Sequence, residues 1–343
     1  MSSVHVRRSP SARAAAPLAR PSAAAAPTPR RPRHPERVAA GVSTVALAGV
    51  AGLALVPGVL DGPTAWVVLA VGLLVGLPHG AVDHLVPEWT LGRRLPRRVF
   101  AAILVAYVLF AAAAFGLLQL VPVLAAGVFL VVSIAHFGAG DVEFRGLGDV
   151  LPRWARPVAV IAYGAPPIVF PIALHADAAA PVLAGLAPRL AVLTTTDVRL
   201  AALAVTLVAV VVTAGLARRA GRGRVVLDLL VLTVTFALAP PLVAFAAYFG
   251  AWHATRHIAR LLLLDPANHD DVAAGRIARP LGRFAWASAG PTLVSLLVLG
   301  ALWWGAGGAQ GLVAAHLGLL VALTMPHVAL VSWLDRRRRA VAV

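Results

Sequence analysis

The sequence predicts an all-α membrane protein, a polytopic bundle of about ten transmembrane helices with both chain ends in the cytoplasm. Three observations support this. Of the 343 residues, 60% are hydrophobic and only 13% are charged, a balance too apolar for a soluble globular domain. After residue 37, apolar runs of about 20 residues, each long enough to cross a bilayer, follow one another to residue 334. Arginine gathers in alternate connections between these runs, which is the positive-inside pattern of membrane proteins.

The N-terminal segment differs from the rest of the chain. Residues 1–37 hold eight arginines, one acid and many prolines and alanines. Such a segment cannot bury enough apolar surface to offset the entropy of ordering it, so we expect a disordered basic tail in the cytoplasm. The transmembrane domain is then predicted to occupy residues 38–335.

Ten runs qualify as spans by length and apolar content. They lie at about 38–60, 64–87, 98–120, 122–144, 156–175, 198–218, 225–239, 241–264, 284–306 and 310–334. The seventh is short and ends at Pro240-Pro241, so we expect it to be kinked, tilted or fused to its neighbour. The connections predicted inside carry arginine clusters such as Arg93-Arg94 and Arg336–Arg339, whereas those predicted outside are nearly bare of charge. This asymmetry predicts a multi-pass protein of the cell membrane.

Charge and cysteine content narrow the function. The formal net charge of +16 comes from arginine alone, because the chain contains no lysine. These arginines lie between apolar runs, which favours the lipid bilayer as partner over nucleic acid. The absence of cysteine excludes disulfides, iron–sulfur clusters and thiolate metal sites. Any metal site must therefore use imidazole, carboxylate or carbonyl ligands.

The segment YFGAWHATRHIARL, residues 248–261, carries the strongest functional signal. His253 and His257 are four residues apart within a predicted span, so both imidazoles project from one helix face. Metalloproteins use this spacing to take two nitrogens from one rigid element. Ionisable groups at membrane depth are costly, so a functional site is the default interpretation.

Other even-numbered spans supply matching histidines. His79, His136 and His327 lie in spans two, four and ten, each about six to twelve residues from the predicted cytoplasmic end. At about 1.5 Å per residue, all five histidines fall within about 10 Å of one depth. Four helices that bring imidazole to one level satisfy the requirement for a metal site in a bundle core. We therefore predict that His79, His136, His253 and His257 bind a metal ion.

Four further side chains are predicted to support these ligands: Asp83, Asp141, His327 and Arg256. Asp83 follows His79 by one turn and is expected to accept its imidazole N–H. His327 has no acid within a turn and is expected to support the ligands or line the substrate site. Arg256 is expected to reach toward the cytoplasmic face or to pair with Asp83 or Asp141.

Four neutral imidazoles suit Fe(II), Cu or Zn. A closed structural zinc site is disfavoured, since such sites usually include thiolates. Octahedral iron would keep open positions for O₂ or substrate. An open metal site within an apolar bundle implies an apolar substrate taken from the bilayer. From the residues alone we predict a metal-dependent reaction on a hydrophobic molecule.

Three motifs on separate spans carry a family resemblance. PHGAVDH at 78–84, AHFGAGD at 135–141 and WHATRH at 252–257, with the Pro-His dipeptide of span ten, resemble the Brp/Blh family of β-carotene 15,15′-dioxygenases over about residues 64–334. The resemblance implies a non-haem Fe(II) enzyme that uses O₂ to cleave the central 15,15′ double bond of β-carotene into two retinal molecules. It places iron on the four predicted ligands.

On this interpretation, the carotenoid lies in a tunnel lined by Phe137, Tyr248, Phe249 and Trp252. The protein would orient the polyene so that one double bond of many faces the metal. The preferred carotenoid stays open, as does any functional link to a retinal-binding rhodopsin.

Three other classes remain as alternatives. Another metal-dependent membrane lipid oxidoreductase would share the metal, although the HxxHH boxes of desaturases are absent from the sequence. A di-haem electron carrier would need axial histidines several turns apart, whereas His253 and His257 are one turn apart. A proton-coupled transporter could use buried His and Asp side chains as a relay.

Overall fold

A computed structural model describes residues 33–305 and 309–341, and every regular element in these ranges is helical. The first half contains the helices α1 (His34–Leu53), α2 (Pro63–Gly76), α3 (Pro78–Ala81), α4 (Val86–Leu91), α5 (Arg97–Leu120), α6 (Pro122–Phe144), η1 (Leu147–Asp149), α7 (Ala155–Gly164) and α8 (Pro166–Leu174). The second half contains α9 (Ala176–Leu186), η2 (Pro188–Thr194), α10 (Thr196–Arg219), α11 (Gly223–Leu238), α12 (Pro241–Ala247), η3 (Tyr248–Ala254), α13 (Thr255–Leu262), η4 (Pro266–Asn268), α14 (His269–Ala273), α15 (Ala278–Gly305) and α16 (Ala309–Val341).

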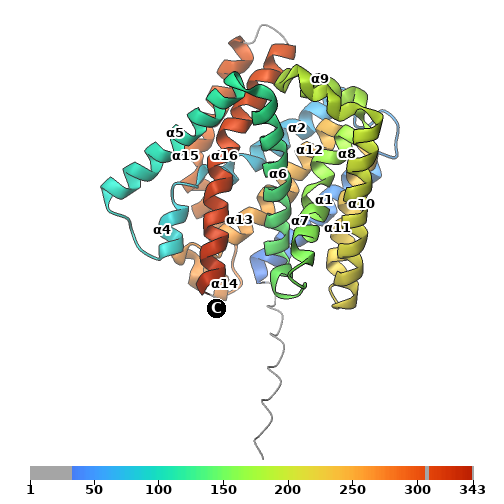
Figure 1. The fold of residues 1–343 in the computed structure, drawn as a ribbon. Coiled ribbons are helices and arrows are strands. Elements are labelled where there is room, and N and C mark those ends of the chain that lie inside the picture. Colours follow the sequence, from blue (N-terminus) through green and yellow to red (C-terminus); the bar gives the residue numbers. More distant parts are fainter. Residues whose placement is uncertain (1–32, 306–308, 342–343) are drawn as a thin grey trace, which may run out of the picture.

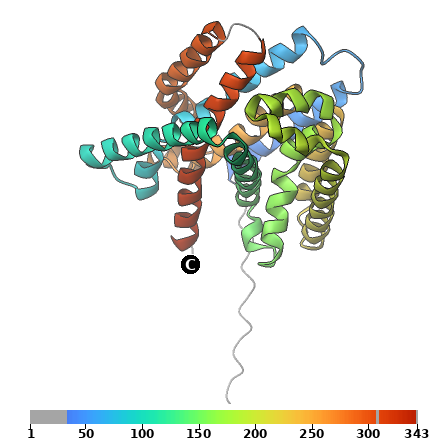
Figure 2. The ribbon, with the colours of Figure 1, turned by 45° about the horizontal axis from the view of Figure 1, so that its top comes forward.

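The helices form two groups on either side of α6. Figure 1 shows α7, α8, α10 and α11 on one side of α6, and α5, α15 and α16 on the other. The helix α5 packs against α16 and extends away from the rest of the bundle in both views (Figures 1 and 2). The start of α1 and the end of α16 lie at the same end of the bundle (Figure 1). The largest apolar core joins α1, α6, α7, α8, α10, α11, α12 and η3.

The outer faces of the bundle suit a bilayer. Many large apolar side chains are exposed, among them Val45, Leu120 and Trp286. Apolar surface on this scale marks contact with lipid or another apolar partner. Seven of the described helices are long and apolar enough to cross a membrane, and the pair α7 and α8, bent by 56°, would make an eighth. The described part of the chain is therefore an all-helical fold of multi-pass membrane type.

The prediction of about ten spans exceeds this number. The predicted spans 225–239 and 241–264 are the two that do not qualify. The first corresponds to α11, which has only 16 residues. The second divides into α12, η3 and α13 and passes through the bundle interior, in contact with α1, α2, α6 and α15. Its polar side chains are buried against other helices, so this segment is part of the protein core and is not a uniformly apolar span.

The first described helix begins inside the predicted N-terminal tail. Helix α1 begins at His34, four residues before the predicted start of the first span. Residues 1–32, the main part of the predicted tail, lie outside the described residues.

Candidate metal centre

Five buried imidazole rings meet at one place in the bundle. The ring centroids of His79 lie 5.2 Å from His253, 5.7 Å from His257 and 4.9 Å from His327. His136 closes the group at 5.0 Å from His253 and 5.1 Å from His327. The rings come from α3, α6, η3, α13 and α16, elements separated by as many as 248 positions in the sequence. We call these five residues the imidazole cluster.

Small residues allow α2 to approach the paired histidines. A Cβ on Gly72 would collide with the backbone of Ala246, and a Cβ on Gly76 would collide with the ring of Phe249. A Cβ on Gly250 would in turn lie 2.7 Å from the Gly72 carbonyl oxygen. Glycines four residues apart, as at 72 and 76, let membrane helices approach closely. This contact brings the end of α2, and with it His79, against the helix that carries His253.

Proline precedes two of the five histidines. Pro78 starts α3 after the interruption at Leu77, and Pro326 lies inside α16. Because proline lacks an N–H, each residue removes a helical hydrogen bond just before a histidine. His79 uses the altered geometry to place its Nδ1 2.5 Å from the Gly76 carbonyl oxygen. That contact occupies Nδ1 and leaves Nε2 available for another partner.

The paired histidines sit where the helix changes type. Residues 248–254 form a π-helical segment, η3, that continues into the α-helical α13. The Thr255 hydroxyl donates to the Gly250 carbonyl at 2.9 Å and supports this wider turn. His253, at the end of η3, faces His136 and His79, while His257 faces His79 and His327, whose ring centroid is 5.5 Å away. Single π-helical turns within α-helices occur frequently at functional sites.

His327 has a carboxylate partner that its own helix does not provide. Its Nδ1 lies 2.8 Å from Oδ2 of Asp83, and the Tyr107 hydroxyl donates to the same oxygen at 2.8 Å. The expectation that Asp83 would accept from His79 is therefore wrong, because the Asp83 carboxylate reaches across to span ten. His79 uses the Gly76 carbonyl instead. The contact between Asp83 and His327 joins residues 244 positions apart, so no local pattern could reveal it.

The cluster has the donors that a metal ion requires. Nitrogen atoms of His79, His253 and His327 all lie within 4.8 Å of one another. Nε2 of His257 and Nε2 of His327 are buried without a hydrogen-bond partner, a costly arrangement that bonding to a metal would relieve. A cavity of about 10 Å³ touches His136, His253 and His257, and this is roughly the space of one water-sized sphere. Imidazole donors of this kind suit iron, copper or zinc.

A network of buried charges lies beside the cluster and includes residues of the helix that carries His253 and His257. Arg256, between the two paired histidines, contacts Oδ1 of Asp141 at 2.7 Å and Oδ2 of Asp228 at 3.0 Å. Arg145 makes two hydrogen bonds of 2.5 Å to Asp228. The Trp252 indole N–H donates to Asp141 at 2.9 Å, and its ring lies 3.4 Å from the Arg256 guanidinium carbon. We call these five residues the ion network.

The ion network bears on the predictions for Arg256, Asp141 and Trp252. Arg256 pairs with Asp141, one of the expected alternatives, and its second carboxylate partner is Asp228. Asp228 was missed, although an aspartate within an apolar run is itself a signal, since such a charge needs a buried partner. Asp141 contacts Arg256 and Trp252, which lie next to His257 and His253 in the chain. Trp252 was predicted to line the substrate tunnel. Its side chain is instead fully buried in this network and lines neither of the two described cavities.

The other three predicted tunnel residues do lie at the cluster. The Phe137 ring is 4.9 Å from His253 and 5.3 Å from Tyr248. The Phe249 ring is 5.5 Å from His79. The Tyr248 hydroxyl is buried without a hydrogen-bond partner. Phe137 and Tyr248 thus pack beside His253, and Phe249 packs beside His79.

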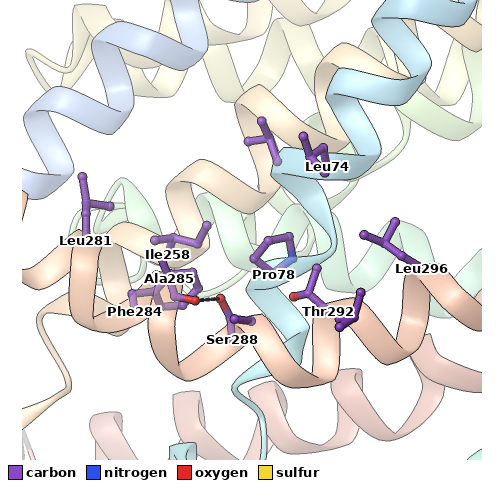
Figure 3. Close-up of a pocket in the computed structure, with 12 residues that line it drawn as sticks. Leu74, Pro78, Ile258, Leu281, Phe284, Ala285, Ser288, Thr292 and Leu296 are labelled. Carbon is purple, nitrogen blue, oxygen red and sulfur yellow. Dashed lines mark hydrogen bonds between the residues drawn. The ribbon is translucent and has the colours of Figure 1, made fainter.

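An apolar groove opens on the outer surface next to the cluster. Its volume is about 480 Å³, and its walls come from α2, α3, α13 and α15. Figure 3 shows Pro78 and Ile258 facing Ser288 and Thr292 of α15 across it. Pro78 and Ile258 are the chain neighbours of His79 and His257. On α3 and α13, the residues that line the groove are therefore adjacent in the chain to histidines of the cluster.

Comparison with known proteins gives consistent results. A family model described as β-carotene 15,15′-dioxygenase matches residues 70–335. A probable β-carotene 15,15′-dioxygenase Blh of Halobacterium salinarum is 31% identical over 316 residues, covering 86% of this chain and 90% of that protein. The Brp protein of the same species, with the same description, is 28% identical and covers 77% and 81%. A β-carotene 15,15′-dioxygenase of an uncultured marine bacterium is 37% identical over 78 residues, 22% of this chain and 28% of its own length. No solved structure matches.

The matched region contains all five clustered histidines, Asp83 and both aspartates of the ion network. Sequence motifs, a helical fold of membrane type and the family comparison therefore agree, and the chain belongs to the Brp/Blh family of β-carotene 15,15′-dioxygenases.

Proposed function

We propose that this protein binds Fe(II) through His79, His136, His253 and His257 and uses O₂ to cleave the central 15,15′ double bond of β-carotene into two molecules of retinal. Both oxygen atoms enter the two aldehydes, so the reaction balances without a further reductant. The observation that carries the proposal is the convergence of buried imidazoles, two of them with unpartnered Nε2 atoms, in a member of this family. Iron at this position would supply the activation of O₂ that a spin-paired hydrocarbon cannot achieve alone.

The chain's own residues would orient the substrate and exclude water. The rings of Phe137, Tyr248 and Phe249 present an apolar wall beside the cluster, against which a polyene can pack. Holding one double bond at the reacting position accounts for regioselectivity, because the bonds of a polyene are chemically similar. The close helix contacts at Gly72 and Gly250 leave little room for water on that side of the cluster.

The apolar groove offers a route from the bilayer to the cluster. A carotenoid dissolved in lipid would reach the groove sideways, between α2 and α15, without entering water. The walls contain few polar groups, of which Ser288 donates its hydroxyl to the Ala285 carbonyl. The enzyme would thus act in the cell membrane, with lipid, carotenoid and O₂ as its partners.

The geometry disfavours the haem alternative. A porphyrin is a flat ring that needs axial ligands on its two opposite faces. Here five imidazoles surround one point at steep mutual angles, with ring planes of His79 and His253 at 86°. A planar macrocycle does not fit between rings that approach one another from several directions at about 5 Å.

The test is production of retinal in a host that accumulates β-carotene, with the products identified by chromatography. We expect retinal from the wild-type protein, and loss of both retinal and bound iron in His253→Ala at unchanged protein level. His269→Ala, an exposed histidine outside the cluster, is the matched control. Full activity in His253→Ala, or cleavage products of other lengths in the wild type, would refute the proposal.

A further inference from the structure

The imidazole cluster contains one more histidine than the four proposed ligands. His327 comes from α16, the last helix, and its ring centroid lies within 4.9 Å of His79, 5.1 Å of His136 and 5.5 Å of His257. It is 5% exposed, as deeply buried as the other four rings. A residue that merely lined a substrate site would touch the edge of the cluster, whereas His327 contacts three of its four other members.

The hydrogen bond of His327 to Asp83 leaves its second ring nitrogen, Nε2, with a lone pair that can bind a metal ion. A carboxylate accepts hydrogen bonds and does not donate them, so Nδ1 of His327 carries the proton that Asp83 receives. Nε2 then keeps its lone pair, and this atom is buried without any partner. A carboxylate behind an imidazole is the arrangement that fixes the tautomer and raises the basicity of metal-ligating histidines. The Tyr107 hydroxyl holds the carboxylate from α5.

The distances fit a shared ion. The nitrogen atoms of His79, His253 and His327 lie within 4.8 Å of one another. Two nitrogens bound to one ion through bonds of about 2.1 Å lie at most about 4.2 Å apart, so only a small contraction of the cluster is needed. Among the described residues, His79, His253 and His327 are the one group of three whose possible ligand atoms lie this close together.

We propose that His327 is a fifth imidazole ligand of the metal, held in position by Asp83 and Tyr107. The inference rests on the proposed metal site and extends it to the last helix. It explains why Asp83 reaches span ten instead of His79, and why a proline loosens α16 just before His327. It also makes α16 part of the site, so that the metal would join the first and last thirds of the chain.

The test uses Co²⁺ as a spectroscopic probe in the purified full-length protein. We expect His327→Gly to bind Co²⁺ at least about 100-fold more weakly than the wild type and with an altered visible spectrum, because a ligand is lost. Added imidazole should occupy the vacated space and restore the spectrum. Asp83→Asn keeps the imidazole but loses the carboxylate charge, and should weaken binding about 10- to 100-fold. Val328→Gly controls for placing glycine in α16.

A cysteine variant decides the case if the glycine variant is not rescued. The chain has no cysteine, so His327→Cys introduces a single thiol. A sulfur-to-cobalt charge-transfer band in His327→Cys that is absent from Val328→Cys would show direct ligation, and a bound Co²⁺ without that band would overturn it. Wild-type affinity and spectrum in His327→Gly would also overturn the inference. If the wild type binds neither Fe²⁺ nor Co²⁺, the proposed function itself fails.

Discussion

The imidazole cluster and the ion network both include residues of the helix 248–262 but differ in how their polar atoms are satisfied. In the ion network, Arg256 and Arg145 face Asp141 and Asp228, and charge is balanced within the network. In the imidazole cluster, the Nε2 atoms of His257 and His327 are buried without a hydrogen-bond partner. Buried polar groups normally have hydrogen-bond partners. The satisfied ion network therefore indicates a structural role, and the unsatisfied nitrogens of the cluster indicate that it binds a metal ion. Removing one side chain from each region should therefore have opposite consequences.

The largest effect on stability is expected in the ion network. Arg256→Met leaves Asp141 and Asp228 short of a buried partner, and breaking a buried ion pair on one side costs about 3–5 kcal/mol. Unfolding in detergent should show this loss, with lower protein yield from membranes. Arg218→Met, at an exposed arginine, is the control. A variant Arg256→Met as stable as the wild type would mean that the ion network does not stabilise the fold.

His257→Ala should have the opposite effect, with a small loss of stability and a large loss of metal affinity. Its Nε2 has no protein partner, so the metal-free protein should lose little stability, while metal affinity falls by at least about 100-fold, or about 2.8 kcal/mol. Activity should fall with iron content. Equilibrium metal binding and thermal unfolding of the metal-free protein measure the two effects separately. A strongly destabilised metal-free variant with normal metal affinity would reverse the roles assigned to the two regions.

The close approach of α2 should affect the cluster more than the network. Gly72→Ala places a Cβ against the backbone of Ala246, and overpacking of this kind costs about 1–3 kcal/mol. Because α2 leads into His79, metal affinity should fall as well. Gly116→Ala, where a Cβ meets nothing within 4 Å, should be neutral or slightly stabilising. Equal behaviour of the two variants would show that the contact does not position His79.

The two regions also differ in whether substrate must reach them, because only the imidazole cluster is proposed to act on carotenoid. Ala289→Trp fills the apolar groove and should raise the apparent KM for carotenoid by about tenfold, or about 1.4 kcal/mol, with iron content unchanged. Val294→Trp places the same side chain on α15 at an exposed position outside the groove. Initial rates in detergent micelles containing β-carotene measure the effect. Identical kinetics of the two variants would exclude the groove as the route.

The ion pairs of Asp271 with two exposed arginine side chains are expected to give the smallest effect. Hydrogen bonds from Arg283 and Arg276 lower the pKa of Asp271 in α14, outside the spans. A lowered pKa contributes stability above the ordinary carboxyl range near pH 4, and that contribution is lost as pH falls through the lowered value. The stability difference between wild type and Asp271→Asn should therefore shrink below about pH 4. Screening by solvent keeps it well below that of Arg256→Met, and a difference that widened in acid would contradict the pairing.

The residues that sequence could predict are those with a local signal. His253 and His257 follow from helical spacing, and His79 and His136 from their common depth in parallel spans. The structure places all four rings together. Their roles as metal ligands remain predictions.

The features that sequence missed depend on contacts between distant helices. Asp83 meets His327 across 244 positions, and Asp228 meets Arg145 across 83. The count of ten spans stays a prediction, because apolar content does not distinguish a buried interior segment, such as 241–262, from a lipid-facing span. Trp252 was placed by its aromatic character, whereas its indole N–H required a partner that Asp141 provides.

X-ray absorption at the iron edge of the purified protein tests the central claim most directly. The account predicts one iron per chain with nitrogen neighbours at about 2.1 Å and the outer-shell scattering that imidazole rings produce. The signal should disappear in His257→Ala and persist in His269→Ala. Iron without imidazole scattering, or a wild-type protein that binds no iron, would contradict it.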